Sequence, residues 1–129
     1  MYGDAVYYVM QSVVETPAYL AAAKEEGMTV DEMMAAVDLV AANPRAGDLI
    51  AGSGGCRKVR LGGKGRGRSG GYRVVTFFAG KDVPVFFLAV LSKGSRANFS
   101  KAERNAMKHA TRSLCESLGA RASSRGSDP

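Results

Sequence analysis

The chain has 129 residues, 46% of them hydrophobic and 23% charged, which suits one compact domain and excludes both a disordered chain and two ordinary domains. No run approaches the roughly 18 apolar residues of a membrane span, and two cysteines, Cys56 and Cys115, are too few for a disulfide scaffold or a cysteine-only zinc site. Residues 1–48 carry eight acidic and two basic side chains, whereas residues 49–129 carry sixteen basic and four acidic ones. Such an uneven positive charge favours a polyanionic partner, usually nucleic acid, or an acidic protein.

The chain begins with a predicted strand and helix. Residues 6–15 are β-branched and aromatic, which is typical of a strand. Thr16 can cap a helix, and Pro17 suits the first helical position, where its missing N–H would be unpaired in any case. We expect this helix to end at Gly27. Because the first ten residues also lack the basic start of a secretory signal, we expect a cytoplasmic protein.

A second predicted helix follows almost directly. Thr29 and Glu32 stand at the spacing of a capping box, and Asn43-Pro44 provides a stop. The apolar residues of this segment fall at helical spacing, which predicts one buried stripe made of Val30, Met33, Met34, Val37 and Val40.

Three strands joined by hairpins are predicted after a glycine-rich loop over residues 44–55. In the first of them, Val59 and Leu61 alternate with Lys58 and Arg60, so the two pairs should face opposite sides of the sheet. The third is apolar throughout, as expected of a strand buried on both faces. The predicted strands cover residues 57–61, 72–78 and 83–91.

The last predicted element is a helix from Ser100, which repeats the capping box with Glu103, to about Leu118. Its buried stripe should consist of Ala102, Ala106, Met107, Ala110, Leu114 and Leu118, opposite a cationic face of Lys101, Arg104, Lys108 and Arg112. The order β-α-α-β-β-β-α predicts an α+β fold, with a small, mostly antiparallel sheet, two N-terminal helices on one face and a C-terminal helix over another part. We expect the domain to cover residues 10–118, preceded by an extension over 1–9 and followed by a disordered tail over 119–129.

Residues 57–73 concentrate the positive charge, with seven cations, no acid and many glycines, which let a backbone approach phosphates closely. Three of the cations, Lys64, Arg66 and Arg68, lie in the predicted hairpin loop, where a flexible solvated tip is an equally good explanation. Strands hold the others in fixed positions. If Lys58, Arg60 and Arg73 project from one face, they form a preorganised cluster around a phosphate.

Conventional catalytic sets are missing from the sequence. The one histidine, His109, lies within the last predicted helix, and carboxylates are scarce beside the cationic stretch, which argues against a magnesium site. We therefore expect neither a metal nor a cofactor. Any reaction at a phosphate would rest on arginine and lysine, which can stabilise developing charge or, for lysine, move a proton.

A string of motifs resembles the RelE/HigB superfamily of toxins, and within it the HigB type, over about residues 12–118. The residues that carry the resemblance are Asn43-Pro44, Gly47-Asp48-Leu49-Ile50, Gly52, Gly54-Gly55, Arg57-Lys58-Val59-Arg60, the Lys/Gly/Arg loop, Gly71-Tyr72-Arg73-Val74-Val75 and Ser92-Lys93.

The resemblance implies the toxin of a type II toxin–antitoxin system, which binds the ribosomal A site and cleaves mRNA without a metal. The 2′-hydroxyl of the message attacks the adjacent phosphate, leaving a 2′,3′-cyclic phosphate or 3′-phosphate and a 5′-hydroxyl. By position, the resemblance implies that the catalytic residues are Lys58, Arg60, Arg73 and Lys93, with Arg73 as the phosphate clamp. It also implies RNA contacts for Arg57, Lys64, Arg66 and Arg68.

The resemblance further implies a cognate antitoxin as partner, with a helix-turn-helix domain, through which the toxin would reach operator DNA. Many family members carry a tyrosine near the end of the last strand or in the C-terminal helix, and residues 92–118 contain none. The alternative function is therefore a catalytically degenerate RNA- or DNA-binding module that acts as antitoxin partner or co-repressor. A third possibility is a structural protein whose basic loop binds an acidic partner.

Overall fold

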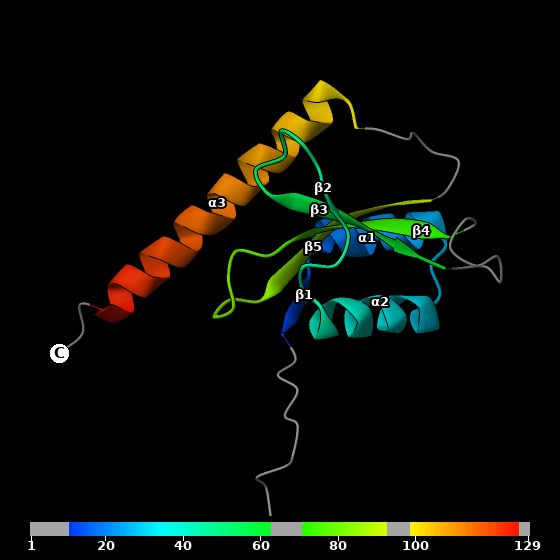
Figure 1. Cartoon of the computed structure of the whole chain (residues 1–129), viewed down its shortest axis with the longest axis horizontal. Coiled ribbons are helices and arrows are strands. Elements are labelled where there is room, and N and C mark those ends of the chain that lie inside the picture. Colours follow the sequence, from blue (N-terminus) through cyan, green and yellow to red (C-terminus); the bar gives the residue numbers. More distant parts are fainter. Residues whose placement is uncertain (1–10, 63–70, 93–98, 127–129) are drawn as a thin grey trace, which may run out of the picture.

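The computed structural model describes residues 11–62, 71–92 and 99–126, and it confirms the predicted α+β fold (Figure 1). None of the described helices is long and apolar enough to span a bilayer. The elements in chain order are β1 (Val13–Glu15), α1 (Pro17–Glu26), α2 (Val30–Ala42), β2 (Asp48–Leu49), β3 (Cys56–Leu61), β4 (Tyr72–Phe77), β5 (Val85–Ser92) and α3 (Lys101–Gly126).

The strands form a single sheet in the order β1-β5-β4-β3-β2. Strand β1 runs parallel to β5, and the other neighbours are antiparallel. Strand β2 lies inside the segment that we predict to be a loop, because two residues are too few to show an alternating pattern. The N-terminal strand is described only over Val13–Glu15, and residues 6–10 of its predicted range lie outside the described residues.

Both N-terminal helices begin and end as predicted. The Thr16 hydroxyl accepts a hydrogen bond from the Tyr19 amide at 3.2 Å, and it also donates to the Phe87 carbonyl at 2.6 Å, which ties the start of α1 to β5. Gly27 ends this helix in the left-handed conformation, with φ of 78°. At the start of α2, Thr29 and Glu32 form the reciprocal capping box.

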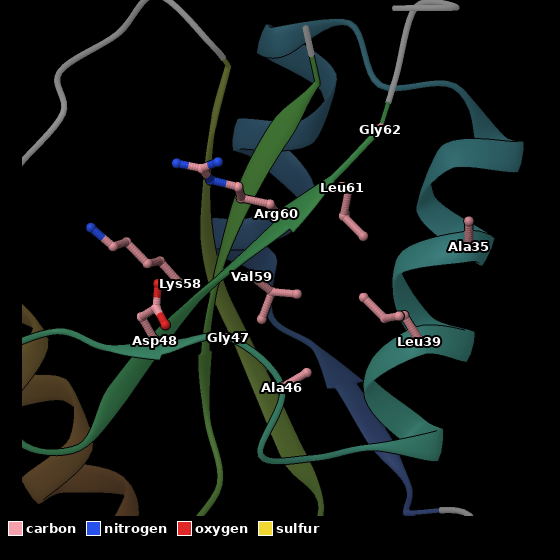
Figure 2. A pocket seen from close by; sticks show the side chains of 10 residues that line it. All are labelled: Ala35, Leu39, Ala46, Gly47, Asp48, Lys58, Val59, Arg60, Leu61 and Gly62. Carbon is pink, nitrogen blue, oxygen red and sulfur yellow. The ribbon is translucent and has the colours of Figure 1, made fainter. Parts of the chain in front are cut away.

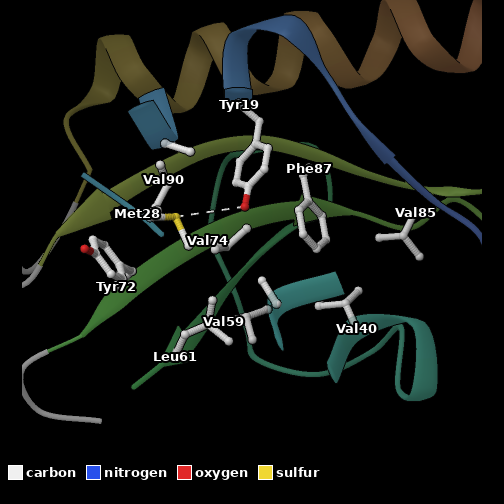
Figure 3. Packing of buried hydrophobic residues seen from close by; sticks show 12 residues of the cluster. Tyr19, Met28, Val40, Val59, Leu61, Tyr72, Val74, Val85, Phe87 and Val90 are labelled. Atoms are coloured by element: carbon white, nitrogen blue, oxygen red, sulfur yellow. Dashed lines mark hydrogen bonds between the residues drawn. The ribbon is translucent and has the colours of Figure 1, made fainter. Parts of the chain in front are cut away.

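Helices α1 and α2 cover one face of the sheet and enclose the first core cluster (Figure 3). At its centre the rings of Tyr19 and Phe87 meet edge to face, with centroids 5.1 Å apart. The predicted stripe of α2 is wrong in part, because Val30 and Met34 are 72% and 58% exposed. Val40 is buried as predicted, and Ala36, which was not in the predicted stripe, is buried with it, since a small alanine lets the helix approach the sheet closely.

Helix α3 covers part of the opposite face, where the second core cluster lies (Figure 1). This cluster contains Ile50, Cys56, Val75, Phe77 and Phe99, with Met107 and Leu114 of α3 packed against it. Strand β5 contributes to both clusters, as predicted for a strand covered on both faces.

The described α3 differs from its prediction in length and in orientation. It continues past Leu118 to Gly126, so residues 119–126 of the predicted tail are helical in the structure. Ala102 and Ala106 are exposed, whereas Thr111 is buried. The predicted cationic face is also partly wrong, because two of its members approach the turn before β3: Arg104 lies beside Gly52, and the backbone of Lys108 lies beside Gly54.

Candidate nucleic-acid interface

The β3–β4 ladder brings three of the predicted site residues to one face of the sheet. Arg60 is the direct partner of Arg73, and Lys58 is the partner of Val75. The alternation predicted for β3 is confirmed, because Val59 and Leu61 are buried in the first core cluster. Figure 2 shows Lys58 and Arg60 pointing away from Val59 and Leu61 on the same side of the strand.

The register sets the spacing within this cationic cluster of Lys58, Arg60 and Arg73. Directly opposed residues of an antiparallel pair have Cβ atoms about 4.5–5.5 Å apart, and diagonal neighbours are separated by about 7–8 Å. Arg60 and Arg73 are opposed, and Lys58 is diagonal to Arg73. Because like charges that face each other across a ladder repel, an anion bound among them relieves an unfavourable arrangement.

A carboxylate that was not among the predicted site residues also belongs to this site. Asp48 of β2 is the direct partner of Lys58, and Figure 2 shows its carboxylate beside the aliphatic stem of that lysine. Its position in the Gly47-Asp48 motif was a usable signal, but the pairing of a two-residue strand with β3 is visible only in the structure.

The turn before β2 depends on a glycine. Gly47 has φ of +90°, and a Cβ there would overlap the carbonyl oxygen of Lys58. Both observations require glycine at this position, since a side chain would be strained and would push β2 away from β3. Gly47 therefore fixes the place of Asp48 next to the cluster.

A cavity of about 560 Å³ adjoins this part of β3 and reaches across to α2 (Figure 2). Its wall combines the apolar side chains of Leu39 and Val59 with the polar side chains of Asp48, Lys58 and Arg60. Within the described residues β2 pairs only with Arg57 and Lys58, so β3 from Val59 to Leu61 borders the cavity as a sheet edge.

The other predicted site residues do not join the described cluster. Arg57 lies on the opposite face of β3, where its Nη1 atom donates a hydrogen bond to the carbonyl oxygen of Gly47 at 3.1 Å. It lies apart from the cluster because adjacent strand residues point to opposite faces, and its RNA contact stays a prediction. The remaining four, Lys64, Arg66, Arg68 and Lys93, lie outside the described residues.

Other groups with reactive chemistry do not join the cluster. Cys56 is buried, and burial raises the pKa of its thiol to about 11. His109 is exposed on α3, and Phe99, just before that helix, packs in the second core cluster. The described part of the chain holds no group of three His, Cys, Asp or Glu side chains arranged to bind a metal ion.

Comparisons with known proteins agree with this fold. The free-state structure of the E. coli toxin RelE, carrying two arginine-to-alanine substitutions, is similar with a TM-score of 0.53 and 20% sequence identity. The match covers 79% of this chain and 97% of that toxin, and it supports the fold alone. A sequence model described as "RelE toxin of RelE / RelB toxin-antitoxin system" matches residues 12–122, which is most of the domain. Such a system pairs a toxin with its antitoxin, and this chain belongs to the RelE toxin family.

Proposed function

We propose that the protein is a HigB-type toxin and that its domain, residues 10–118, acts in the cytoplasm as a ribosome-dependent mRNA endoribonuclease. The observation that carries this proposal is the placement of Lys58, Arg60 and Arg73 on one sheet face by the β3–β4 register. Family membership supplies the toxin class, and the cationic cluster supplies a site suited to a phosphodiester.

The reaction that this cluster supports is an internal transfer at phosphorus. The 2′-oxygen of the message forms a new P–O bond, the bond from phosphorus to the 5′-oxygen breaks, and the products are a cyclic phosphate and a 5′-hydroxyl. The phosphate gains charge as the 2′-oxygen attacks, and fixed guanidinium groups stabilise that charge without reorganising. Arg73, whose planar fork suits two phosphate oxygens, is the clamp, and Arg60 opposes it.

Lys58 is assigned the proton transfer at the reacting oxygens, as the group that can both give and accept a proton. Asp48, its cross-strand partner, places a carboxylate beside the stem of this lysine. Lys93 is proposed as a fourth cation, and Lys64, Arg66 and Arg68 as contacts to ribosomal RNA, from their positions in the sequence.

Substitution of the clamp tests the proposal. Expression of the protein should arrest growth and produce cleaved mRNA with 5′-hydroxyl ends, and Arg73→Ala should abolish both while the circular dichroism spectrum stays unchanged. Loss of one preorganised donor lowers catalytic rates by about 10²–10³. The matched control is Arg112→Ala, which removes the same charge from an exposed position on α3 and should still arrest growth. Full toxicity of a variant with Lys58→Ala, Arg60→Ala and Arg73→Ala together would reject the site.

The antitoxin is proposed to be encoded by a neighbouring gene and to carry a helix-turn-helix domain that binds operator DNA. It should neutralise the toxin by covering the cationic cluster with acidic or amphipathic segments. Co-expression of the neighbouring gene should restore growth, and failure of that rescue would reject this partner.

A second candidate function is a binding module without catalytic activity, favoured by the lack of tyrosine in residues 92–118. Such a module would retain binding to RNA or to the antitoxin but would not cut mRNA. Primer extension on total RNA separates the two functions, because growth arrest without new 5′ ends supports the module and specific new ends support the nuclease.

A further inference from the structure

Arg57, on the face of β3 opposite Lys58, lines a second cavity of about 230 Å³. This cavity lies at the end of the sheet where β3 begins and β4 has ended. The larger side chains that bound it are those of Arg45, Leu49, Arg57 and Phe78. It is therefore separate from the cationic cluster, although Arg57 and Lys58 are consecutive in the chain.

Both guanidinium groups of this cavity are held in place by the protein. Arg57 donates to the Gly47 carbonyl oxygen at 3.1 Å, and the guanidinium carbon of Arg45 lies 5.6 Å from the centroid of the Phe78 ring. The ring itself is partly buried against the first core cluster, which fixes it as a platform for Arg45. Because a guanidinium group has five N–H donors, each arginine keeps donors for a ligand.

The wall of the cavity combines positive charge with apolar surface. No carboxylate is among the described residues that line it. Leu49 is 62% exposed beside the two arginines, where it contributes nothing to either core cluster. An exposed leucine next to stacked Arg45 and Phe78 offers a flat, partly apolar surface of the kind on which unstacked nucleobases bind.

We propose that this cavity binds one nucleotide of single-stranded RNA outside the segment that is cut. The phosphate lies between Arg45 and Arg57, whose planar forks suit two phosphate oxygens each. The base packs against Leu49 and the stacked pair of Arg45 and Phe78. An acidic peptide would use the same arginines but would leave this apolar surface without a role.

The edge of the sheet permits one RNA strand to reach both sites. Strand β2 is the edge strand and is only two residues long, so little protein separates the face that carries Lys58 from the face that carries Arg57. Whether the bound strand is mRNA or ribosomal RNA depends on the proposed function. The ability of the cavity to bind a nucleotide does not depend on it.

Binding of a labelled single-stranded 2′-O-methyl oligoribonucleotide, which lacks the attacking hydroxyl, tests the proposal by fluorescence anisotropy at several salt concentrations. Arg45→Ala should weaken binding about tenfold and lower the log–log salt slope by about one, as expected for one lost phosphate contact. Phe78→Leu should weaken binding about tenfold with an unchanged slope, because stacking involves no ion release. The exposed control Arg112→Ala should affect the affinity less than either.

Two results would overturn the proposal. One is an unchanged affinity of Phe78→Leu, and the other is competition by polyglutamate as effective as that by unlabelled RNA, which would make the cavity a carboxylate site. Growth arrest separates this proposal from the proposed function. If the Arg45 and Phe78 variants lose oligonucleotide binding while Arg73→Ala stays fully toxic, the RNA-binding cavity is supported and the nuclease site is rejected. If the Arg45 and Phe78 variants bind normally while Arg73→Ala is not toxic, the cavity is rejected and the nuclease site is supported.

Discussion

Individual side chains in this protein show how burial changes the chemistry of a group. Tyr19 is buried between α1 and β5, and burial together with the nearby charge of Glu15 raises the pKa of its phenol from 10.0 to about 12. Cys56 shows the same effect in the second core cluster, from 9.0 to about 11. Both groups are neutral in the folded protein at pH values where the unfolded chain has already lost the proton.

The raised pKa of Tyr19 predicts a loss of stability at alkaline pH. The contribution of Tyr19 to the free energy of unfolding is fully present below pH 10. It is lost as the pH rises toward 12, because the tyrosine of the unfolded chain ionises first, and the whole loss is about 2–3 kcal/mol. Tyr19→Phe should reduce this loss in urea unfolding measured between pH 8 and pH 11.5. At pH 7 the variant should match the parent closely, since the hydroxyl contacts Met28 Sδ at 4.0 Å, a weak interaction. An unchanged alkaline loss in Tyr19→Phe would contradict the assignment.

Removal of the Thr76 hydroxyl should not destabilise the protein. Among the described residues, this hydroxyl is the one buried side-chain N or O atom without a hydrogen-bond partner. Thr76→Val should leave the free energy of unfolding unchanged or raise it by about 1–2 kcal/mol, since it removes an uncompensated polar group while keeping the shape. Thr111→Val is the matched control. The Thr111 hydroxyl donates to the Lys108 carbonyl at 2.9 Å, so this variant should lose stability. A destabilised Thr76→Val would show that the hydroxyl has a partner after all.

At the scale of elements, the turn before β2 is the place where one glycine controls a strand. Gly47→Ala should lower the free energy of unfolding by about 2–4 kcal/mol, because the left-handed backbone and the Lys58 carbonyl both exclude a side chain. Gly80→Ala is the control, since a Cβ at Gly80 meets nothing within 4 Å. Chemical denaturation of the two variants gives the comparison. Equal stabilities would show that β2 does not depend on Gly47.

The elements also show which features the sequence could predict. Capping boxes and the left-handed glycine made both ends of α1 and the starts of α2 and α3 predictable, because these signals act within a few residues, whereas the end of α3 has no such signal. The direction of the α2 stripe was not predictable, since the apolar residues that face the sheet are selected by the fit of Ala36 against it. Strand β2 was not predicted because its two residues are extended only through their pairing with β3, which no local sequence pattern shows.

The candidate site was predictable in the same partial way. The period of two placed Lys58 and Arg60 on one face, and the same period places Arg57 on the other. Opposition of Arg60 and Arg73 depends on the register of β3 against β4, and a slip by one residue would send Arg73 to the other face. That register results from packing of the whole sheet, which no local pattern reports.

Over the whole molecule, the basic second half of the chain supplies the cationic cluster, so repulsion is concentrated on one sheet face. Arg60→Gln should therefore raise the free energy of unfolding at low salt by about 0.2–1 kcal/mol while weakening RNA binding. The gain should vanish in 1 M NaCl, where the screening length falls to about 3 Å. Urea unfolding at both salt concentrations measures the effect. A gain that persists at high salt would arise from packing instead of charge.

The parallel pairing of β1 with β5 determines when the protein can fold during its synthesis. The Thr16 hydroxyl at the start of α1 bonds to Phe87, 71 residues later, and β5 is the only strand that flanks β1 in the described sheet. A nascent chain that has not yet exposed Val85 to Ser92 has no neighbour for β1 and no surface on which to seat Tyr19. A folded toxin therefore cannot form before residues as far as Ser92 have been synthesised, so the strand that begins the sheet stays unpaired until late in synthesis.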